Sequence, residues 1–323
     1  MRPEDDDQDS GVVIARVGVP AWGLPTWHLQ SLELLLLLRI AKRRHAVEYE
    51  PYGYTSSTGS LPACEIADGT MLASSEAVER FAEEVDADLG DLARVYRVLC
   101  QTQLAPVVDL ALFQNEDNFN RVTVGLYRAT PFPVSAILPR VSRRESLRRR
   151  SCRSGSSDQA ILADCKSALR SCEYMLDKTG GPFVLGARPT SCDASLLSFL
   201  LLAQRLPVSD PDFTELVTPA LARYIDDSMY LVEGMIDALP GTDADPDADA
   251  TRGINEQYSL YMQQWRRRSK AKVPGDDVRP APDAPIRTPD DLVRERHNRI
   301  AIGIGVGAVV AFLLFGNVIK YSE

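Results

Sequence analysis

The sequence is poor in side chains that bind metals. It has three histidines, His28, His45 and His297, and none of them neighbours another candidate ligand. Its six cysteines are scattered and form no CxxC pair, so no zinc-type site is predicted. Cys165 and Cys172 lie on one predicted helix, seven residues and about 10 Å apart, which is too far for a disulfide. Scattered cysteines without a secretory signal indicate a reducing compartment.

Motifs for nucleotide binding and hydrolysis are also absent. The sequence contains no P-loop pattern, no GxSxG elbow and no HExxH. A net charge of −9 argues against nucleic acid as the main partner. The acidic N-terminus, residues 1–10, is neither apolar like a secretory signal nor rich in arginine like a transit peptide. We therefore predict no metal, no cofactor and no catalytic residue for these chemistries.

One long uncharged run is present near the C-terminus, at residues 300–319. Its twenty residues would form a helix of about 30 Å, the thickness of a hydrocarbon core. Arginines precede the run and four residues follow it, which predicts a single-pass tail anchor with the body in the cytosol. Moderate hydrophobicity and a short basic tail favour the mitochondrial outer membrane over the thicker plasma membrane. The alternative is a buried core helix, although twenty uncharged residues exceed the usual length.

Small residues recur along this apolar run. Gly303, Gly307 and Ala311 stand at every fourth position, which would let another helix approach closely. Gly303, Gly305 and Ala308 also match the dinucleotide pattern GxGxx(G/A), but only 15 residues follow Ala308. That pattern needs an acidic residue about 20 positions further on, so we reject it. The predicted membrane-anchor residues are Ile300, Gly303, Gly307, Ala311, Phe315 and Ile319.

A second apolar run, LELLLLLRIA at residues 32–41, is of a different kind. Glu33 and Arg39 bound its five central leucines, so it is too short to span a membrane. It predicts a helix buried on most of its surface, for example between a sheet and a second domain.

The order of predicted elements indicates the fold class. Strands are predicted at 12–20 and 46–52 and on both sides of a turn at Asp68 and Gly69, with helices at 27–43 and 75–84. This order is a thioredoxin-like layout with a shortened middle. No strand is predicted after residue 90, so an all-helical part follows. The helices predicted there span 91–113, 117–128, 158–178, 192–205, 212–229 and 253–271.

Two further patterns lie in the helical part. Thr190 and Asp193 have the spacing of a capping box at the start of a helix. Residues 140–153 are rich in arginine and are predicted to form an exposed loop or a frayed helix. A solvated charge run is the simpler interpretation, and contact with acidic lipid headgroups or an acidic partner is the functional one.

Changes in composition divide the chain into segments. Two stretches rich in Asp and Pro interrupt the globular pattern and are predicted to be solvated linkers. The predicted organisation is an acidic tail (1–10), a thioredoxin-like domain (11–86), a helical domain (87–239), an acidic linker (240–252), an accessory helix (253–272), a Pro-rich linker (273–293) and a transmembrane anchor (300–319).

Several short segments resemble the metaxin family. They are WGLP (22–25), TGSLPA (58–63), PFPVSAILP (131–139), FVLGARPTSCDA (183–194) and the apolar run at 300–319. The resemblance implies a glutathione-transferase-like α+β fold and a place in the mitochondrial outer-membrane sorting and assembly machinery, which inserts β-barrel proteins. It also implies a β-barrel insertase subunit and a second metaxin-like subunit as partners, with outer-membrane lipid and precursor proteins as further candidates.

The same resemblance raises the question of glutathione chemistry. A glutathione transferase needs a hydroxyl or thiol just after its first strand, to stabilise or replace the glutathione thiolate. Residues 19–25, VPAWGLP, contain neither, and the first candidate is Thr26. Ser74 stands where these enzymes place an acid or an amide, and Pro62 is expected to be cis. The wall of the site is therefore kept while the activating group is missing.

We predict from these residues a protein that is not an enzyme. Trp22 and Trp27, near the former active-site position, are interpreted as packing residues. The function predicted is that of a subunit supporting β-barrel insertion and protein import. The alternative is a tail-anchored enzyme of the glutathione-transferase type or a membrane-shaping factor.

Overall fold

The computed structural model describes residues 12–50, 59–127, 134–152, 157–208, 213, 215–233 and 235. These residues belong to one compact unit, which spans Met1–Arg267. The described part holds no helix with the length and apolar character needed to cross a membrane. The predicted segments 1–10, 240–252, 253–272 and 273–293 and the anchor residues Ile300, Gly303, Gly307, Ala311, Phe315 and Ile319 lie outside it.

A four-stranded mixed sheet forms the N-terminal part, in the order β2-β1-β3-β4. Strand β1 (Val13–Gly18) pairs in parallel with β2 (His45–Glu50) and antiparallel with β3 (Ala63–Glu65), and β3 pairs antiparallel with β4 (Met71–Ala73). Strands β1 and β2 are joined through a helix, as parallel strands require. Strands β3 and β4 are joined through the predicted turn at Asp68. This sheet confirms the thioredoxin-like prediction.

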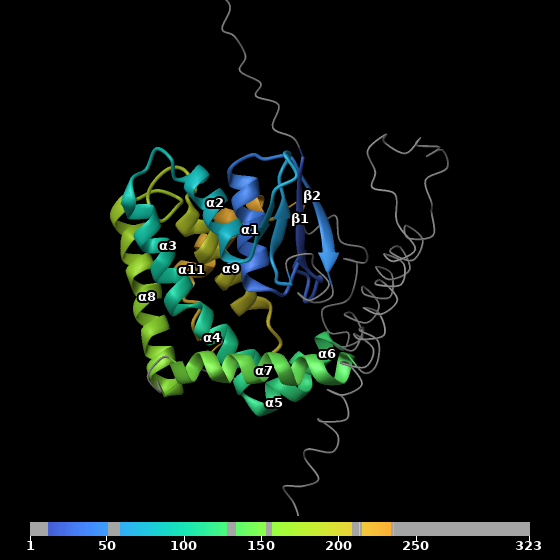
Figure 1. Cartoon of the computed structure of the whole chain (residues 1–323). Coiled ribbons are helices and arrows are strands. Elements are labelled where there is room, and N and C mark those ends of the chain that lie inside the picture. Colours follow the sequence, from blue (N-terminus) through green and yellow to red (C-terminus); the bar gives the residue numbers. More distant parts are fainter. Residues whose placement is uncertain are drawn as a thin grey trace, which may run out of the picture. The chain divides into compact units, whose positions relative to one another are not determined.

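Helices make up the rest of the described part (Figure 1). The two that belong to the thioredoxin-like part are α1 (Leu29–Ile40) and α2 (Ser75–Val85). The others are α3 (Asp91–Gln103), α4 (Ala105–Asp109), α5 (Glu116–Asn118), α6 (Val124–Leu126), α7 (Val134–Cys152), α8 (Asp158–Thr179), α9 (Ser191–Arg205) and α11 (Pro219–Ser228), with π-helical turns at Leu110–Gln114 and Phe119–Thr123 and a 3-10 turn at Met229–Leu231. The predicted α+β class, a thioredoxin-like part followed by an all-helical part, is thereby confirmed.

Helix α1 is buried on both sides, as its leucine run predicts. Every residue from Ser31 to Leu38 is buried, because the helix packs on β1 and also against α2 and α9. Figure 1 shows α1 between the sheet and α9. A helix that is apolar all round needs such a position. The sheet and the helical part therefore share one hydrophobic core.

Glu33 is a carboxyl group inside this apolar helix, and it is 2% exposed. Its Oε1 accepts hydrogen bonds from Gln101 Nε2 of α3, at 2.8 Å, and from Ser195 Oγ of α9. Buried polar groups are tolerated when they are hydrogen-bonded. Glu33 therefore ties the first helix of the thioredoxin-like part to two helices of the helical part.

The predicted capping box at the start of α9 is present and forms part of a larger cluster. Asp193 Oδ2 accepts from Thr190 N at 2.9 Å and from Thr190 Oγ1 at 2.8 Å. Its Oδ1 accepts from Val184 N at 2.9 Å and from the phenol hydroxyl of Tyr224, Oη, at 3.0 Å. The carboxylate thus joins the start of α9 to the preceding loop and to α11, which the spacing of Thr190 and Asp193 alone does not indicate.

The main correction concerns the Arg-rich segment. It is neither a loop nor frayed where the structure describes it, but forms the greater part of the 19-residue helix α7. Three predicted helices also differ in extent. The helix predicted at 91–113 is divided into α3, α4 and a π-helical turn, and the one predicted at 117–128 into α5, a π-helical turn and α6. Within the range predicted at 212–229, helix α11 begins at Pro219, which takes the first helical position as prolines prefer.

Replacing Glu33 with Gln tests the buried carboxyl group. Burial raises the pKa of Glu33 above its ordinary value of 4.5, so the folded state holds this proton more tightly than the unfolded state. The free energy of unfolding of the wild type should therefore fall relative to E33Q as the pH rises from about 4.5 through the raised pKa, and then level off. Urea denaturation of both proteins across this range measures the difference. Glu83→Gln, at an exposed position on α2, is the matched control, and parallel curves for wild type and E33Q would contradict the prediction.

Candidate functional site: a cleft between the sheet and α7

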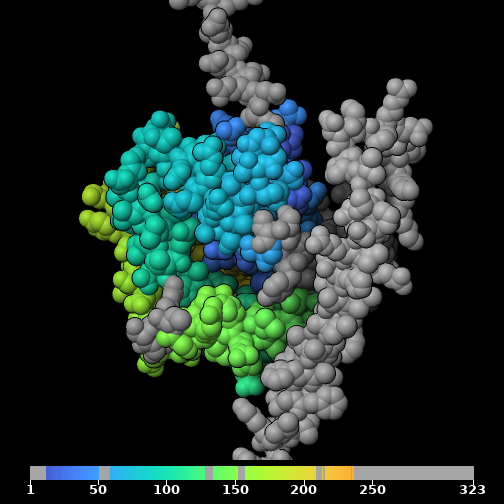
Figure 2. All heavy atoms as spheres, in the orientation of Figure 1, coloured from blue at the N-terminus to red at the C-terminus, as the bar shows by residue number. Residues whose placement is uncertain are grey.

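A cleft of about 580 Å³ lies where the thioredoxin-like part faces the helical part. One wall comes from the start of α1 and from the segments around Leu61 and Ser74. The opposite wall comes from α4, the π-helical turn after it and α7. In Figure 2 this part of the molecule lies above the green surface of α7. Its position is the one the sequence predicts for a glutathione-type wall.

The backbone of the first wall has the predicted shape. The Leu61–Pro62 peptide is cis, as expected. Ser74 has φ 48°, a left-handed conformation that residues with a side chain rarely adopt, and its N–H donates to Pro62 O at 2.5 Å. Helix α2 begins immediately after it, at Ser75. This wall therefore keeps the predicted backbone shape, and a serine occupies the position with the strained backbone conformation.

The first hydroxyl after β1 is not available to a ligand. Thr26 is 0% exposed, and its Oγ1 accepts a hydrogen bond from His28 N at 3.2 Å. Ser31 is equally buried, and its Oγ lies 2.9 Å from His28 Nδ1. This serine–histidine pair stands within the first turn of α1, where the buried hydroxyl cannot reach a substrate. It therefore orders the start of the helix and does not form a nucleophile.

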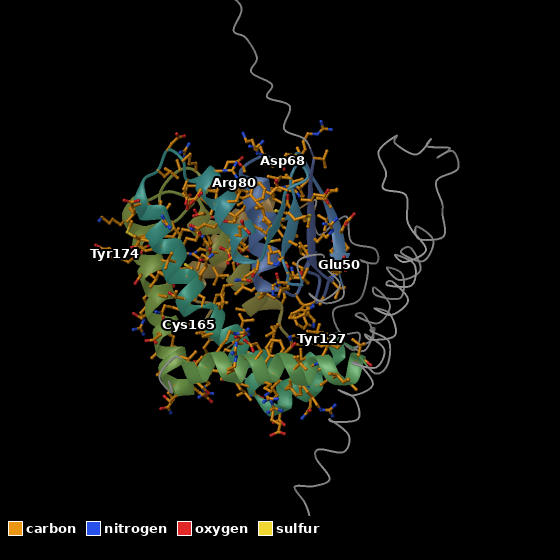
Figure 3. The ribbon with its side chains drawn as sticks, in the orientation of Figure 1. Glu50, Asp68, Arg80, Tyr127, Cys165 and Tyr174 are labelled. Atoms are coloured by element: carbon orange, nitrogen blue, oxygen red, sulfur yellow. The ribbon has the colours of Figure 1, made fainter. Side chains whose placement is uncertain are left out.

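The second wall carries polar groups that pair with one another. Arg149 Nη2 lies 2.9 Å from Asp109 Oδ2, and Arg150 Nη1 donates to Gln114 Oε1 at 2.8 Å. Tyr127, labelled in Figure 3 near the junction with α7, lies beside Trp27 with ring centroids 6.2 Å apart in an edge-on arrangement. Trp27 therefore contributes to packing between the two walls, as predicted, while also lining the cleft.

His28 is the one titratable side chain on the first wall of the cleft whose pKa is strongly shifted. Burial and, as the smaller cause, the positive charge of Arg149 together lower its pKa to about 4. The imidazole is therefore neutral at neutral pH. The sequence does not indicate this site, because no candidate ligand lies near His28 along the chain.

None of the described cysteines lines the cleft. Cys64, Cys100, Cys165, Cys172 and Cys192 are free and buried. Burial raises the pKa of Cys64 to about 11 and that of Cys165 to about 12, so both are protonated at neutral pH. Cys100 Sγ and Cys172 Sγ lie 3.8 Å apart inside the helical core. The described residues also contain no cluster of three or more metal-ligating side chains.

Comparison with known proteins gives the cleft its context. The profile of a family described as "Outer mitochondrial membrane transport complex protein" matches residues 31–143. Metaxin-1 of Mus musculus is 26% identical over 203 residues, and the match covers 58% of this chain and 64% of the relative's length. A metaxin-1 homolog of Caenorhabditis briggsae is 24% identical over 312 residues, covering 91% of this chain and 92% of the relative. These matches show that the chain is similar to proteins of the metaxin family.

Among solved structures, a glutathione transferase of Phanerochaete chrysosporium is similar to this chain. The TM-score is 0.48 at 14% identity, covering 69% of this chain and 98% of the transferase.

Arg149→Gln tests the electrostatics of the cleft. Removing the guanidinium should raise the pKa of His28 above about 4, while burial, the larger cause, still holds it below the ordinary 6.5. The chain has only three histidines, so titration of the imidazole resonances by NMR is a direct measurement. Arg144→Gln, an exposed arginine on the same helix, should leave the resonance unchanged. Equal shifts in the two variants would contradict this assignment of the charge.

Proposed function

We propose that this protein is a non-enzymatic subunit of the mitochondrial outer-membrane sorting and assembly machinery, where it supports β-barrel insertion and protein import. The observation that carries the proposal is the similarity to metaxins, with residues 31–143 matching the profile of an outer-membrane transport complex protein. The general role proposed is protein transport at that membrane. The specific pathway proposed is the insertion of β-barrel proteins.

The geometry of the cleft supports a role without catalysis. Glutathione transfer needs an accessible group to stabilise the thiolate. The first hydroxyl after β1, on Thr26, is buried and already accepts a hydrogen bond, and the thiol of Cys64 is protonated at neutral pH. A fold that keeps its two walls while lacking this group is suited to present a rigid surface to other proteins.

The proposed location depends on the apolar run at 300–319. We propose that it anchors the protein in the outer membrane with the body on the cytosolic side, and that Gly303, Gly307 and Ala311 provide a contact for another helix. The anchor would raise the local concentration of the body near its partners. These partners are proposed to be the β-barrel insertase subunit and a second metaxin-like subunit.

Glutathione chemistry is tested on the purified full-length protein. We expect no conjugation of a standard electrophile above the uncatalysed rate and no retention on glutathione resin, because no accessible group lowers the pKa of the glutathione thiol. A catalytically active glutathione transferase run in parallel is the control for both assays. Saturable turnover by this protein would refute the non-enzymatic part of the proposal.

The transport role is tested in mitochondria that lack the protein. The steady-state level of outer-membrane β-barrels should fall and their assembly should slow, while import into the matrix is less affected at early times. Re-expression of the full chain should restore assembly. A version whose residues 300–323 are replaced by an unrelated outer-membrane anchor should restore most of it, if the body carries the contacts.

Deletion of residues 300–323 tests the anchor itself. The shortened protein should be released by alkaline carbonate, whereas the full chain should stay with the membrane. Normal β-barrel assembly without the protein would remove the proposed function, and a carbonate-resistant deletion variant would remove the proposed anchor. The two outcomes are independent of each other.

A further inference from the structure

Helix α7 presents a row of arginines away from the body. Arg140, Arg144 and Arg148 are exposed and occur at every fourth position, so they follow one another along one face at about 6 Å intervals. Leu147 belongs to the same face, three residues after Arg144, and is 43% exposed. We call these four residues the outer face of α7. Figure 2 shows the helix, in green, along the lower edge of the described body.

The other arginines of α7 are used to hold the helix. Arg143 places its guanidinium 4.7 Å from the ring centroid of Phe119, a cation–π contact. Arg149 pairs with Asp109, and Arg150 pairs with Asp158 and donates to Gln114. These contacts join α7 to the segment before it and to α8. The helix is therefore fixed to the body through its inner side, with the outer face left toward solvent.

The outer face makes contacts of a different kind. Arg140 Nη1 donates to the carbonyl of Ala136 at 2.7 Å, within its own helix. Arg148 pairs with Glu145, also in its own helix, and both side chains are well exposed. Within the described residues, no hydrogen bond or ion pair is made by Arg144. Arg140, Arg144 and Arg148 are all exposed, so the outer face is accessible to a partner outside the body.

We propose that the outer face of α7 docks on an anionic lipid surface. A row of guanidinium groups matches the phosphates of a membrane surface, and each basic residue near such a surface contributes about 1 kcal/mol. The exposed Leu147 within the row favours lipid over an acidic protein segment, because a membrane interface accepts apolar and cationic side chains together. Glu145 is the single acidic residue of α7 and is already paired.

This inference rests on the proposed membrane location and not on the role in transport. Docking through α7 would set the orientation of the body, and with it the direction in which the cleft opens. The simpler interpretation is a solvated charge run. In that case the outer face would be equally accessible on neutral and on anionic membranes.

Arginine footprinting of the full chain distinguishes the two interpretations. The protein is reconstituted in nanodiscs of phosphatidylcholine, or of phosphatidylcholine with about 30% phosphatidylinositol, and treated with phenylglyoxal before mass spectrometry. Modification of Arg140, Arg144 and Arg148 should be about fivefold slower on the anionic discs, the factor that corresponds to about 1 kcal/mol per arginine. Salt at about 1 M, where the Debye length falls to roughly 3 Å, should remove the protection.

Internal controls come from the same spectra. Arg80, Arg170 and Arg223 are exposed on α2, α8 and α11, and their rates should be equal on both discs. Figure 3 labels Arg80 at the end of the body opposite α7. Equal modification rates of the outer face on both discs would overturn the proposal. Protection that is already present in detergent would also overturn it, because it would indicate that a protein segment covers the outer face. Because the footprint involves no import assay, its failure is distinct from failure of the proposed function.

Discussion

The burial of helix α1 on two sides is the constraint on which the rest of this structure depends. A helix whose residues 31–38 are all buried needs apolar partners all round, and the sheet can cover only one side. Helix α9, itself buried along most of its length, covers the other. The hydrogen bonds from Glu33 to α3 and α9 then select one packing among the many that leucine side chains would accept. The thioredoxin-like part and the helical part are consequently held in one geometry.

That geometry creates the cleft and also limits what it can do. The start of α1 forms one wall, so the residues that order this helix end also decide which groups face the cleft. Thr26 and Ser31 turn their hydroxyls inward, to the N–H of His28 and to its ring. His28 itself is neutral because burial and Arg149 both disfavour its charged form. The same interactions that order the start of α1 thus keep the hydroxyls of Thr26 and Ser31 buried.

The local sequence of α7 disfavours a helix, and tertiary contacts stabilise it. Pro139 lies inside the helix, where it removes a backbone hydrogen bond, and six arginines with one glutamate repel one another along it. The helix persists because its inner side is fixed by Phe119, Asp109 and Asp158. Arg140, Arg144 and Arg148 are exposed and form a single row.

The order of strands and helices, the buried character of the leucine run, the cis peptide before Pro62 and the capping box at Thr190 were all predictable, because each follows from local patterns of apolar, turn and capping residues. The roles of the charged residues were not predictable. Whether an arginine is engaged or exposed, and whether a carboxyl group such as Glu33 is buried, depends on residues brought together from distant parts of the chain. Those contacts are made by packing, and only the tertiary structure decides them.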